Sequence, residues 1–439
     1  MAWPTGSSPN VSFEKNFCPS PWFHTRINNS GNYEYCRWAV KHERQSLPDI
    51  RQQTPIHWFQ HGMSDIRRAM LEGREIPGCA ECRIMENHGK ISGRQRQLLK
   101  IGVTAEDFSK SMLTSAWLDT FRHSLENDGD TDQLPQDWQI DLGNFCNSAC
   151  LFCEPHSSSR LAAEFKKIGF INELPPRAWC DDPALLDSFL ETLEKSPHIA
   201  YLHFIGGETL ITPAFKIILE KLIQSGLAAK ITIGFTTNLT IWDQEIVELL
   251  YQFQQVNLGM SLECLHSLND YVRYGSKIDT VQQLMSRWIS VAKEHQWLIQ
   301  LRITPTVLSI WHLDTVYEFA SEQGIAVESC NFLNDPVFMR PSVLPRSWRD
   351  RVIEKLQSWI DSQEQDTGSP IINTRNPDFA RQQVIEDAKS YVAYLEQQPD
   401  ESDRLPALVS YLQTMENNRK NSVLDYLPEY EELLRSAGY

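Results

Sequence analysis

The sequence predicts an α/β protein whose middle region forms a parallel, curved sheet covered by helices. Between residues 131 and 336, strand-like runs alternate with segments of helical length and period. Six such units are present, and parallel neighbours need a crossover between them that a helix usually supplies. We therefore expect a partial (β/α)6 TIM barrel at 131–336, preceded by a separate region at 1–130 and followed by helices at 337–439.

The six predicted strands are short runs rich in β-branched, aromatic and other apolar residues. They are Trp138–Leu142, Ala200–Ile205, Ile231–Thr236, Val256–Leu262, Leu298–Val307 and Ala326–Phe332. Between most of them lie helical segments, such as Pro213–Ile223, Val281–His295 and Leu313–Gln323.

The two flanking regions differ from the middle in pattern. Residues 13–83 contain many prolines and glycines and indicate loops with little regular structure, whereas 84–130 look helical. After Pro336 the sequence becomes polar, acidic and helical in period. The chain therefore divides into the three regions 1–130, 131–336 and 337–439, which suits its length of 439 residues.

Composition and charge limit which partners the protein can bind and where in the cell we expect it. Lys and Arg total 41 against 57 Asp and Glu, a formal charge of −16. This balance argues against nucleic acid, because phosphate binding draws on clustered Lys and Arg. No run approaches the ~20 apolar residues that span a bilayer, and the start lacks a signal-peptide pattern, so we expect a soluble, cytoplasmic protein without membrane partners. Ten cysteines then indicate metal ligation or redox work rather than disulfides.

Three of these cysteines form one tight group, Cys146, Cys150 and Cys153, directly after the first predicted strand. Three thiolates can hold three irons of a cubane cluster and leave the fourth iron open to bind something else. The loop after a barrel strand is also where such folds place their active sites. A zinc site completed by Cys180 or His156 has the same spacing, so the triplet alone leaves both metals open.

The sequence Gly206-Gly207-Glu208 follows the second predicted strand. Paired glycines let a ligand approach the backbone closely, and a carboxylate beyond a strand end can accept hydrogen bonds from an amine. With both motifs in this order, the chain closely resembles the radical S-adenosylmethionine enzymes. The cysteine triplet matches the cluster motif of that family, and Gly206, Gly207 and Glu208 match its amino-group motif.

The resemblance implies a chemistry and further binding residues. The open iron of a [4Fe-4S] cluster would bind S-adenosylmethionine, and one electron would cleave it to a 5′-deoxyadenosyl radical that abstracts hydrogen. Phe152 would flank the adenine, and Asn238 ends the third strand in the family's pattern. Ser261 and Arg273 would hold the methionine carboxylate. Relatives often carry Asp where this chain has Glu263, which leaves the role of that position open.

A second group of cysteines lies near the amino terminus: Cys18, Cys36, Cys79 and Cys82. Four thiols close a metal site completely, and zinc and an iron–sulfur cluster are equally compatible with them. The surrounding sequence resembles the twitch domain, a shortened SPASM domain, which holds one auxiliary [4Fe-4S] cluster. The positions that carry this resemblance are Cys18 to His24, Cys79 to Cys82, Glu86, Gly89, Ser92 and Arg94.

The three remaining cysteines are Cys180, Cys264 and Cys330, and each is expected to be a buried small apolar residue. Cys264 has a second interpretation, because it follows the fourth predicted strand near the expected mouth of the barrel. A thiol there could return a hydrogen atom to a substrate radical, which makes Cys264 a candidate catalytic residue.

The resemblance, which spans about residues 15–335, implies a peptide as substrate. Auxiliary-cluster relatives commonly modify ribosomally made precursors by epimerisation, cross-linking, or excision and splicing. The expected partners are a precursor peptide, a reductant such as flavodoxin or ferredoxin, and optionally a small peptide-recognition protein. The alternatives are a radical enzyme acting on a small molecule or carbohydrate, and a non-catalytic iron–sulfur or zinc protein that binds partners or transfers electrons.

Overall fold

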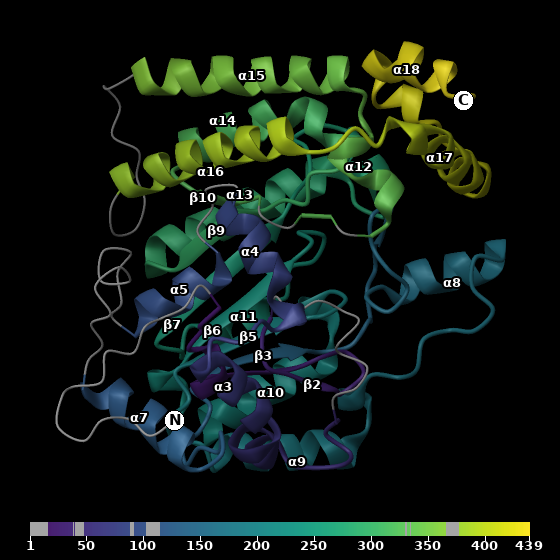
Figure 1. The fold of residues 1–439 in the computed structure, drawn as a ribbon. Helices are drawn as coiled ribbons and strands as arrows, with labels where there is room; N and C mark the ends of the chain where they lie inside the picture. The colour runs from purple at the N-terminus through teal and green to yellow at the C-terminus, as the bar shows by residue number, and fades with distance from the viewer. Residues whose placement is uncertain are drawn as a thin grey trace. The chain divides into compact units, whose positions relative to one another are not determined.

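The computed structural model describes residues 16–37, 39, 48–87, 92–101, 115–329, 332–333, 335–365 and 377–439 (Figure 1). The chain divides into two compact units. The first unit comprises Met1–Asp141, Arg177–His203 and Lys221–Ile231, and the second comprises Leu142–Pro176, Phe204–Glu220 and Thr232–Tyr439. Strand β5 (Tyr201–Ile205) has residues in both units.

The second unit contains most of the predicted sheet. Its strands follow one another in the order β10-β9-β7-β6-β5, and the β6–β7, β7–β9 and β9–β10 pairs are parallel. The strands are β6 (Thr232–Thr237), β7 (Gln255–Ser261), β9 (Leu298–Arg302) and β10 (Ala326–Glu328). Sequential strands lie side by side, as helical crossovers require, so the prediction of a largely parallel α/β sheet is confirmed.

Amphipathic helices connect these strands. In α13 (Ile278–His295), the buried residues Val281, Met285, Trp288 and Ala292 recur at helical spacing on one face. The other helices between the strands of this unit are α11 (Gln244–Leu250), α12 (Leu268–Val272) and α14 (Leu313–Gln323). Helix α10 (Pro213–Gln224) follows β5 and has residues in both units.

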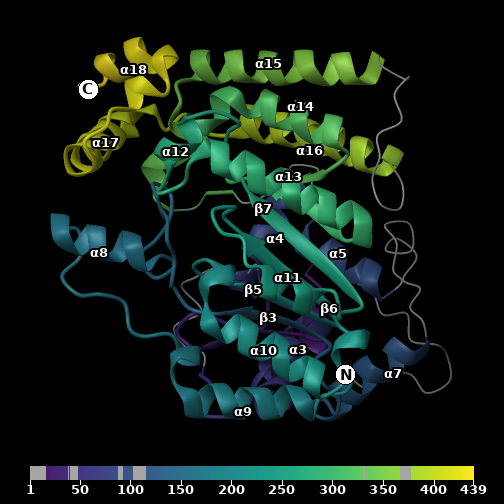
Figure 2. The same ribbon diagram turned by 180° about the vertical axis from the view of Figure 1, so that it is seen from behind.

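The carboxyl-terminal part of the second unit is helical, as predicted. Its helices are α15 (Arg346–Gln365), α16 (Pro377–Gln397), α17 (Leu405–Arg419) and α18 (Glu431–Ser436). Helices α14, α15 and α16 lie side by side in both ribbon views (Figures 1 and 2). Among the described residues, no helix combines the length and apolar character needed to cross a membrane.

Two predicted strands end earlier than the sequence pattern suggested. Strand β9 stops at Arg302 instead of Val307, because Pro305 has no N–H and the N–H of Thr304 bonds to the Glu263 carboxylate (3.0 Å) instead of a neighbouring strand. Strand β10 stops at Glu328, and Cys330 lies outside the described residues.

The first unit contains the strand order β5-β3-β1-β2. Strand β3 (Asp137–Asp141) pairs in parallel with β1 (His24–Ile27), which pairs antiparallel with β2 (Tyr33–Glu34). The helices are α2 (Pro55–His57), α3 (Ser64–Leu71), α4 (Ala80–Asn87), α5 (Gly93–Lys100), α7 (Ser115–Glu126) and α9 (Pro183–Glu194).

The expectation that residues 13–83 hold little regular structure is therefore wrong. Strand β1 escaped notice because its buried side chains include charged ones. Arg26 is buried between the carboxylates of Asp141 (2.5 Å) and Glu34 (3.0 Å), and His24 contacts Asp137 (3.1 Å). Buried charge is tolerated when it is paired, but the partner of Arg26 on β3 is more than a hundred residues away in sequence.

Candidate active site

The cysteine triplet lies on one loop of the second unit, which we call the cysteine loop (residues 142–158). It connects β3 to α8 (Ser159–Ile168) and contains the short strand β4 (Ala149–Cys150). Cys150 is buried, whereas Cys146 and Cys153 are half-buried. A turn closed by the Cys153 N–H on the Cys150 carbonyl (3.1 Å) keeps the last two cysteines close.

The three thiols stand in an environment that opposes their ionisation. Burial raises the pKa of Cys146 to about 12 and raises those of Cys150 and Cys153 as well. The other two thiolates also raise the pKa of Cys153, so the three sulfurs lie within electrostatic range of one another. A cationic metal centre reverses this balance, because it stabilises thiolates directly. The loop therefore fits a metal cluster held by three cysteines.

The Gly-Gly-Glu sequence is joined to the cysteine loop by backbone hydrogen bonds. The N–H of Gly207 donates to the Gly143 carbonyl (2.8 Å), and that of Glu208 donates to the Phe145 carbonyl (2.8 Å). A Cβ on Gly207 would lie 2.2 Å from the Phe145 oxygen, and one on Gly206, at φ +135°, would lie 2.7 Å from the Gly143 oxygen. Both glycines are required because the cysteine loop approaches them so closely.

The Glu208 side chain and Asn238 connect the cysteine loop to the end of β6. Glu208 is buried and accepts hydrogen bonds from the N–H groups of Asn238 (2.6 Å) and Leu210 (3.2 Å), and burial raises its pKa to about 7. The Asn238 amide donates to Asn147 (2.8 Å) and Ser148 (3.1 Å), which stand between the first two cysteines. Asn238 thus holds the cysteine loop in place through its side chain. The sequence did not reveal these contacts.

Arg273 stands directly opposite the middle cysteine. Strand β8 (Arg273–Tyr274) pairs antiparallel with β4, which places Arg273 across from Cys150. Its Nη1 lies 3.9 Å from the Cys150 sulfur, and its Cζ lies 5.3 Å from the Phe152 ring centroid. The Nε of Arg273 is buried and has no hydrogen-bond partner. A buried orphan donor beside the cysteine loop suits a ligand carboxylate.

Glu263 acquires a structural role that the sequence left open. It is buried and accepts a hydrogen bond from Nη2 of Arg273 (2.7 Å). Burial raises the pKa of Glu263 to about 7, although Arg273 acts in the opposite direction. Because Glu263 holds one edge of the guanidinium group, the remaining edges keep a fixed orientation toward the cysteine loop.

The other predicted positions lie near the ends of the same strands. Ser261 is the last residue of β7 and is paired with Arg302 of β9. Cys264 follows three residues later and is fully buried, and burial raises its pKa well above the ordinary value for a thiol. Cys180 is a buried residue of the first unit, as expected of a small apolar side chain.

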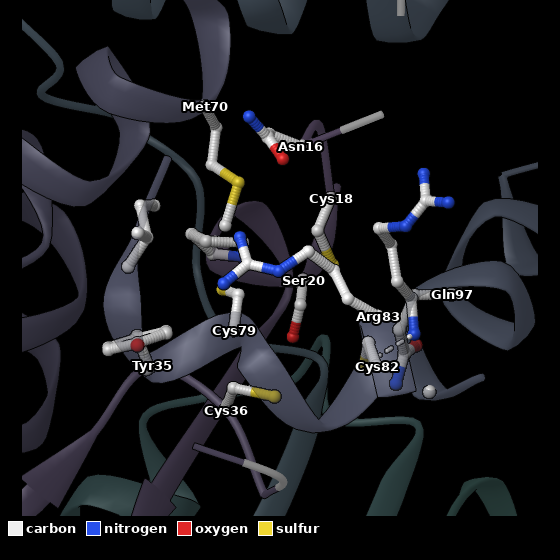
Figure 3. Close-up of a pocket in the computed structure, with 15 residues that line it drawn as sticks. Asn16, Cys18, Ser20, Tyr35, Cys36, Met70, Cys79, Cys82, Arg83 and Gln97 are labelled. Atoms are coloured by element: carbon white, nitrogen blue, oxygen red, sulfur yellow. Dashed lines mark hydrogen bonds between the residues drawn. The ribbon is translucent and has the colours of Figure 1, made fainter. Parts of the chain in front are cut away.

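In the first unit, Cys18, Cys36, Cys79 and Cys82 line a single cavity (Figure 3). The cavity contains about 580 Å³ of space not filled by atoms, part of it open to solvent. Burial raises the pKa of Cys18 well above its usual range, and the other three thiols raise it further. Tertiary structure therefore brings together four cysteines that span more than sixty residues of sequence.

The sequence positions that follow this second group support one wall of the cavity. The N–H of Arg94 donates to the Cys82 sulfur (3.4 Å). The Glu86 carboxylate accepts hydrogen bonds from the Arg94 guanidinium (2.5 and 2.9 Å) and from the Ser92 hydroxyl (2.5 Å). Gly89 lies outside the described residues.

Across the part of the chain that the structure describes, no three His, Cys, Asp or Glu side chains are arranged to hold a single metal ion.

Comparison with known proteins identifies the domain that contains the cysteine loop. Residues 140–293 match the family model of the Radical SAM superfamily. This segment includes the cysteine triplet, the Gly-Gly-Glu sequence and Arg273. No curated protein matches the chain.

Several solved structures are similar to this chain. SuiB of Streptococcus suis bound to S-adenosylmethionine is 16% identical, with 69% of this chain and 64% of that chain covered and a TM-score of 0.38. SuiB bound to its precursor peptide SuiA is 16% identical, with coverages of 65% and 60% and a TM-score of 0.39. Native anSMEcpe with bound AdoMet is 17% identical, with coverages of 55% and 64% and a TM-score of 0.39. This chain thus spans less than two thirds of the length of each.

Substitution of Gly207 by Ala should displace the cysteine loop. The added methyl would overlap the Phe145 carbonyl, so the loop must move and should no longer retain its cluster after anaerobic reconstitution, as measured by iron content and visible absorbance. Gly169→Ala is the control, because open space surrounds that glycine and an alanine at its positive φ costs only about 1–2 kcal/mol. Normal iron binding by Gly207→Ala would contradict the structure.

Substitution of Glu263 by Gln should both destabilise the fold and weaken binding of S-adenosylmethionine. It leaves the buried Arg273 without its counter-charge, which we expect to lower the free energy of unfolding by about 3 kcal/mol in urea denaturation. Calorimetry should show weaker binding because the guanidinium loses its fixed orientation. Glu431→Gln, which breaks an exposed ion pair with Arg435, should leave both measurements unchanged. Equal behaviour of the two variants would refute the assigned role of Glu263.

Proposed function

We propose that the chain is a radical S-adenosylmethionine enzyme, as the match of residues 140–293 to that family model supports, and that it modifies a peptide, specifically a ribosomally made precursor, through abstraction of hydrogen from a C–H bond. The observation that carries the proposal is the cysteine loop, whose middle cysteine lies across from Arg273 and whose Gly143 and Phe145 carbonyls accept hydrogen bonds from the Gly-Gly-Glu backbone. We propose the cytoplasm as the compartment, because thiols remain reduced there and a flavodoxin or ferredoxin can supply the electron.

The cysteine loop and the neighbouring Arg273 would bind different parts of the cluster and of S-adenosylmethionine. Cys146, Cys150 and Cys153 would hold a [4Fe-4S] cluster, which together with S-adenosylmethionine supplies a one-electron cleavage that yields a 5′-deoxyadenosyl radical. The orphan Nε of Arg273 would bind the methionine carboxylate while Glu263 holds Nη2 of the same guanidinium group.

Other binding positions follow from the resemblance. The backbone at Gly206, Gly207 and Glu208 would receive the amino group, Phe152 would flank the adenine, and Ser261 would assist Arg273. Asn238 contributes indirectly, because it holds Asn147 and Ser148 of the cysteine loop.

The surface beside the triplet is compatible with a peptide and disfavours a polyanion. Phe145, which directly precedes Cys146, leaves 55% of its surface exposed. An exposed aromatic ring offers an apolar contact to a peptide side chain. The net charge of −16 disfavours a highly anionic substrate. A small peptide-recognition protein could present the precursor.

We further propose that the cavity of the first unit holds an auxiliary [4Fe-4S] cluster on Cys18, Cys36, Cys79 and Cys82. All four thiols line that cavity, and Arg94 donates to one of the sulfurs. Hydrogen bonds to sulfur are a recognised means of tuning such clusters. On this proposal, residues 1–130 form a twitch-like domain, 131–336 the radical SAM partial barrel and 337–439 a helical extension.

The proposed function predicts two clusters and a modified peptide. Anaerobically reconstituted protein should contain about eight irons per chain, and after reduction with dithionite it should cleave S-adenosylmethionine. Co-expression with a short precursor encoded nearby should change the mass of that precursor. Cys150→Ser should abolish cleavage and modification, whereas Cys180→Ser, which alters a buried cysteine outside both groups, should not.

Three results would contradict this proposal in different ways. Zinc in place of iron would indicate a metal-stabilised binding protein, and iron without cleavage of S-adenosylmethionine would indicate an electron carrier. Cleavage that consumes a small molecule or carbohydrate but leaves every peptide unmodified would assign the enzyme another substrate class.

We propose Cys264 as the donor that returns a hydrogen atom to the substrate radical; the thiyl radical left on Cys264 would take up one electron from the flavodoxin or ferredoxin and one proton to restore the thiol. Its raised pKa keeps the S–H bond intact, and that bond is the one a donor must give up. Cys264→Ala should therefore still form 5′-deoxyadenosine but lose the modified product, as measured by mass spectrometry. Cys180→Ala, another buried cysteine substitution, should preserve the product. Unchanged product yield in Cys264→Ala would eliminate this role.

A further inference from the structure

Two side chains of α17 bond to the cysteine loop on either side of its middle cysteine. Arg419 donates from Nη2 to the carbonyl of Ala149 (2.7 Å), and the Tyr411 hydroxyl donates to the carbonyl of Leu151 (2.9 Å). Both bonds are buried and join residues more than 250 positions apart. We propose that Arg419 and Tyr411 are positioning residues of the cluster site, and that α17 holds Cys150 in place for the iron it binds.

Arg419 is itself held rigidly by an acidic partner. Its Nε and Nη2 form a bidentate contact with the two carboxylate oxygens of Glu164 on α8 (2.9 and 2.7 Å). The two side chains are only 2% and 7% exposed. The guanidinium also lies over the Tyr274 ring, with its Cζ 4.2 Å from the centroid. A planar fork fixed in this way points the second N–H of Nη2 in one direction, here toward the Ala149 carbonyl.

These two hydrogen bonds add to the few that hold the short strand β4 and Leu151 in place. On its other side, β4 pairs with β8, and the Leu151 N–H donates to the Val272 carbonyl (2.8 Å). Cys150 is therefore held between β8 and α17. Second-sphere partners of this kind orient a metal ligand and tune the metal.

The inference rests on the proposed cluster at the triplet, and its test uses the full chain with matched controls. Tyr411→Phe removes one hydroxyl, and Tyr430→Phe removes an equivalent hydroxyl that donates to the Val307 carbonyl (2.9 Å) away from the cysteine loop. Arg419→Lys is compared with Arg349→Lys, since Arg349 is also buried and donates to the Pro399 carbonyl (2.8 Å). Thermal unfolding measures the general loss of stability in all four variants.

The readout is the electron paramagnetic resonance signal that changes when S-adenosylmethionine is added, because this response distinguishes the triplet cluster from an auxiliary one. Tyr411→Phe and Arg419→Lys should lose that signal to an iron chelator about 10-fold faster than the wild type, with altered g values. Tyr430→Phe and Arg349→Lys should keep the wild-type rate and spectrum even where thermal stability falls.

The outcomes separate this inference from the proposed function. A responsive signal in the wild type that persists equally in Tyr411→Phe and Tyr430→Phe would overturn the positioning role alone. Equal acceleration in the test and control variants would also overturn it, because the effect would then be general destabilisation. A wild-type protein whose reconstituted cluster ignores S-adenosylmethionine would overturn the proposed function and this inference together.

Discussion

The fixation of the cysteine loop is the constraint on which the rest of the second unit depends. The loop contains only two residues of strand, so it cannot hold three thiols in place through its own backbone. Hydrogen bonds from the Gly-Gly-Glu backbone, from Asn238, from β8 and from α17 replace that missing regularity. Each contact comes from an element that the parallel sheet or the carboxyl-terminal helices place beside the loop.

Buried ion pairs orient the two arginines that lie beside the cysteine loop. Arg273 and Arg419 both lie near Cys150, and each is bound to a buried carboxylate, Glu263 and Glu164 respectively. Taking charges out of water is costly, so such pairs contribute little net stability. Their value here is geometric, because a guanidinium held by a carboxylate presents its other donors in a fixed direction. The same arrangement places positive charge next to the Cys150 sulfur.

In the first unit, buried ion pairs and hydrogen bonds likewise support the second group of cysteines. Its strand β1 carries Arg26 in a buried position, compensated by Asp141 and Glu34. Glu86 organises Ser92 and Arg94 so that a backbone N–H points at the Cys82 sulfur. The polar residues of this region therefore support the cavity that the four cysteines line, and their polarity is the reason that its strands were missed from sequence.

The sequence by itself determined the α/β class, the six strands of the middle region, the triplet and the Gly-Gly-Glu sequence, because these depend on local periodicity and short spacing. It also grouped the four amino-terminal cysteines by their chemistry. Only the tertiary structure decided that Glu263 anchors Arg273, that the two glycines are required by the cysteine loop, and that Arg419 and Tyr411 reach the carbonyls beside Cys150. These contacts join residues on elements far apart in the chain, and no local pattern records which distant carbonyl or carboxylate a side chain will meet.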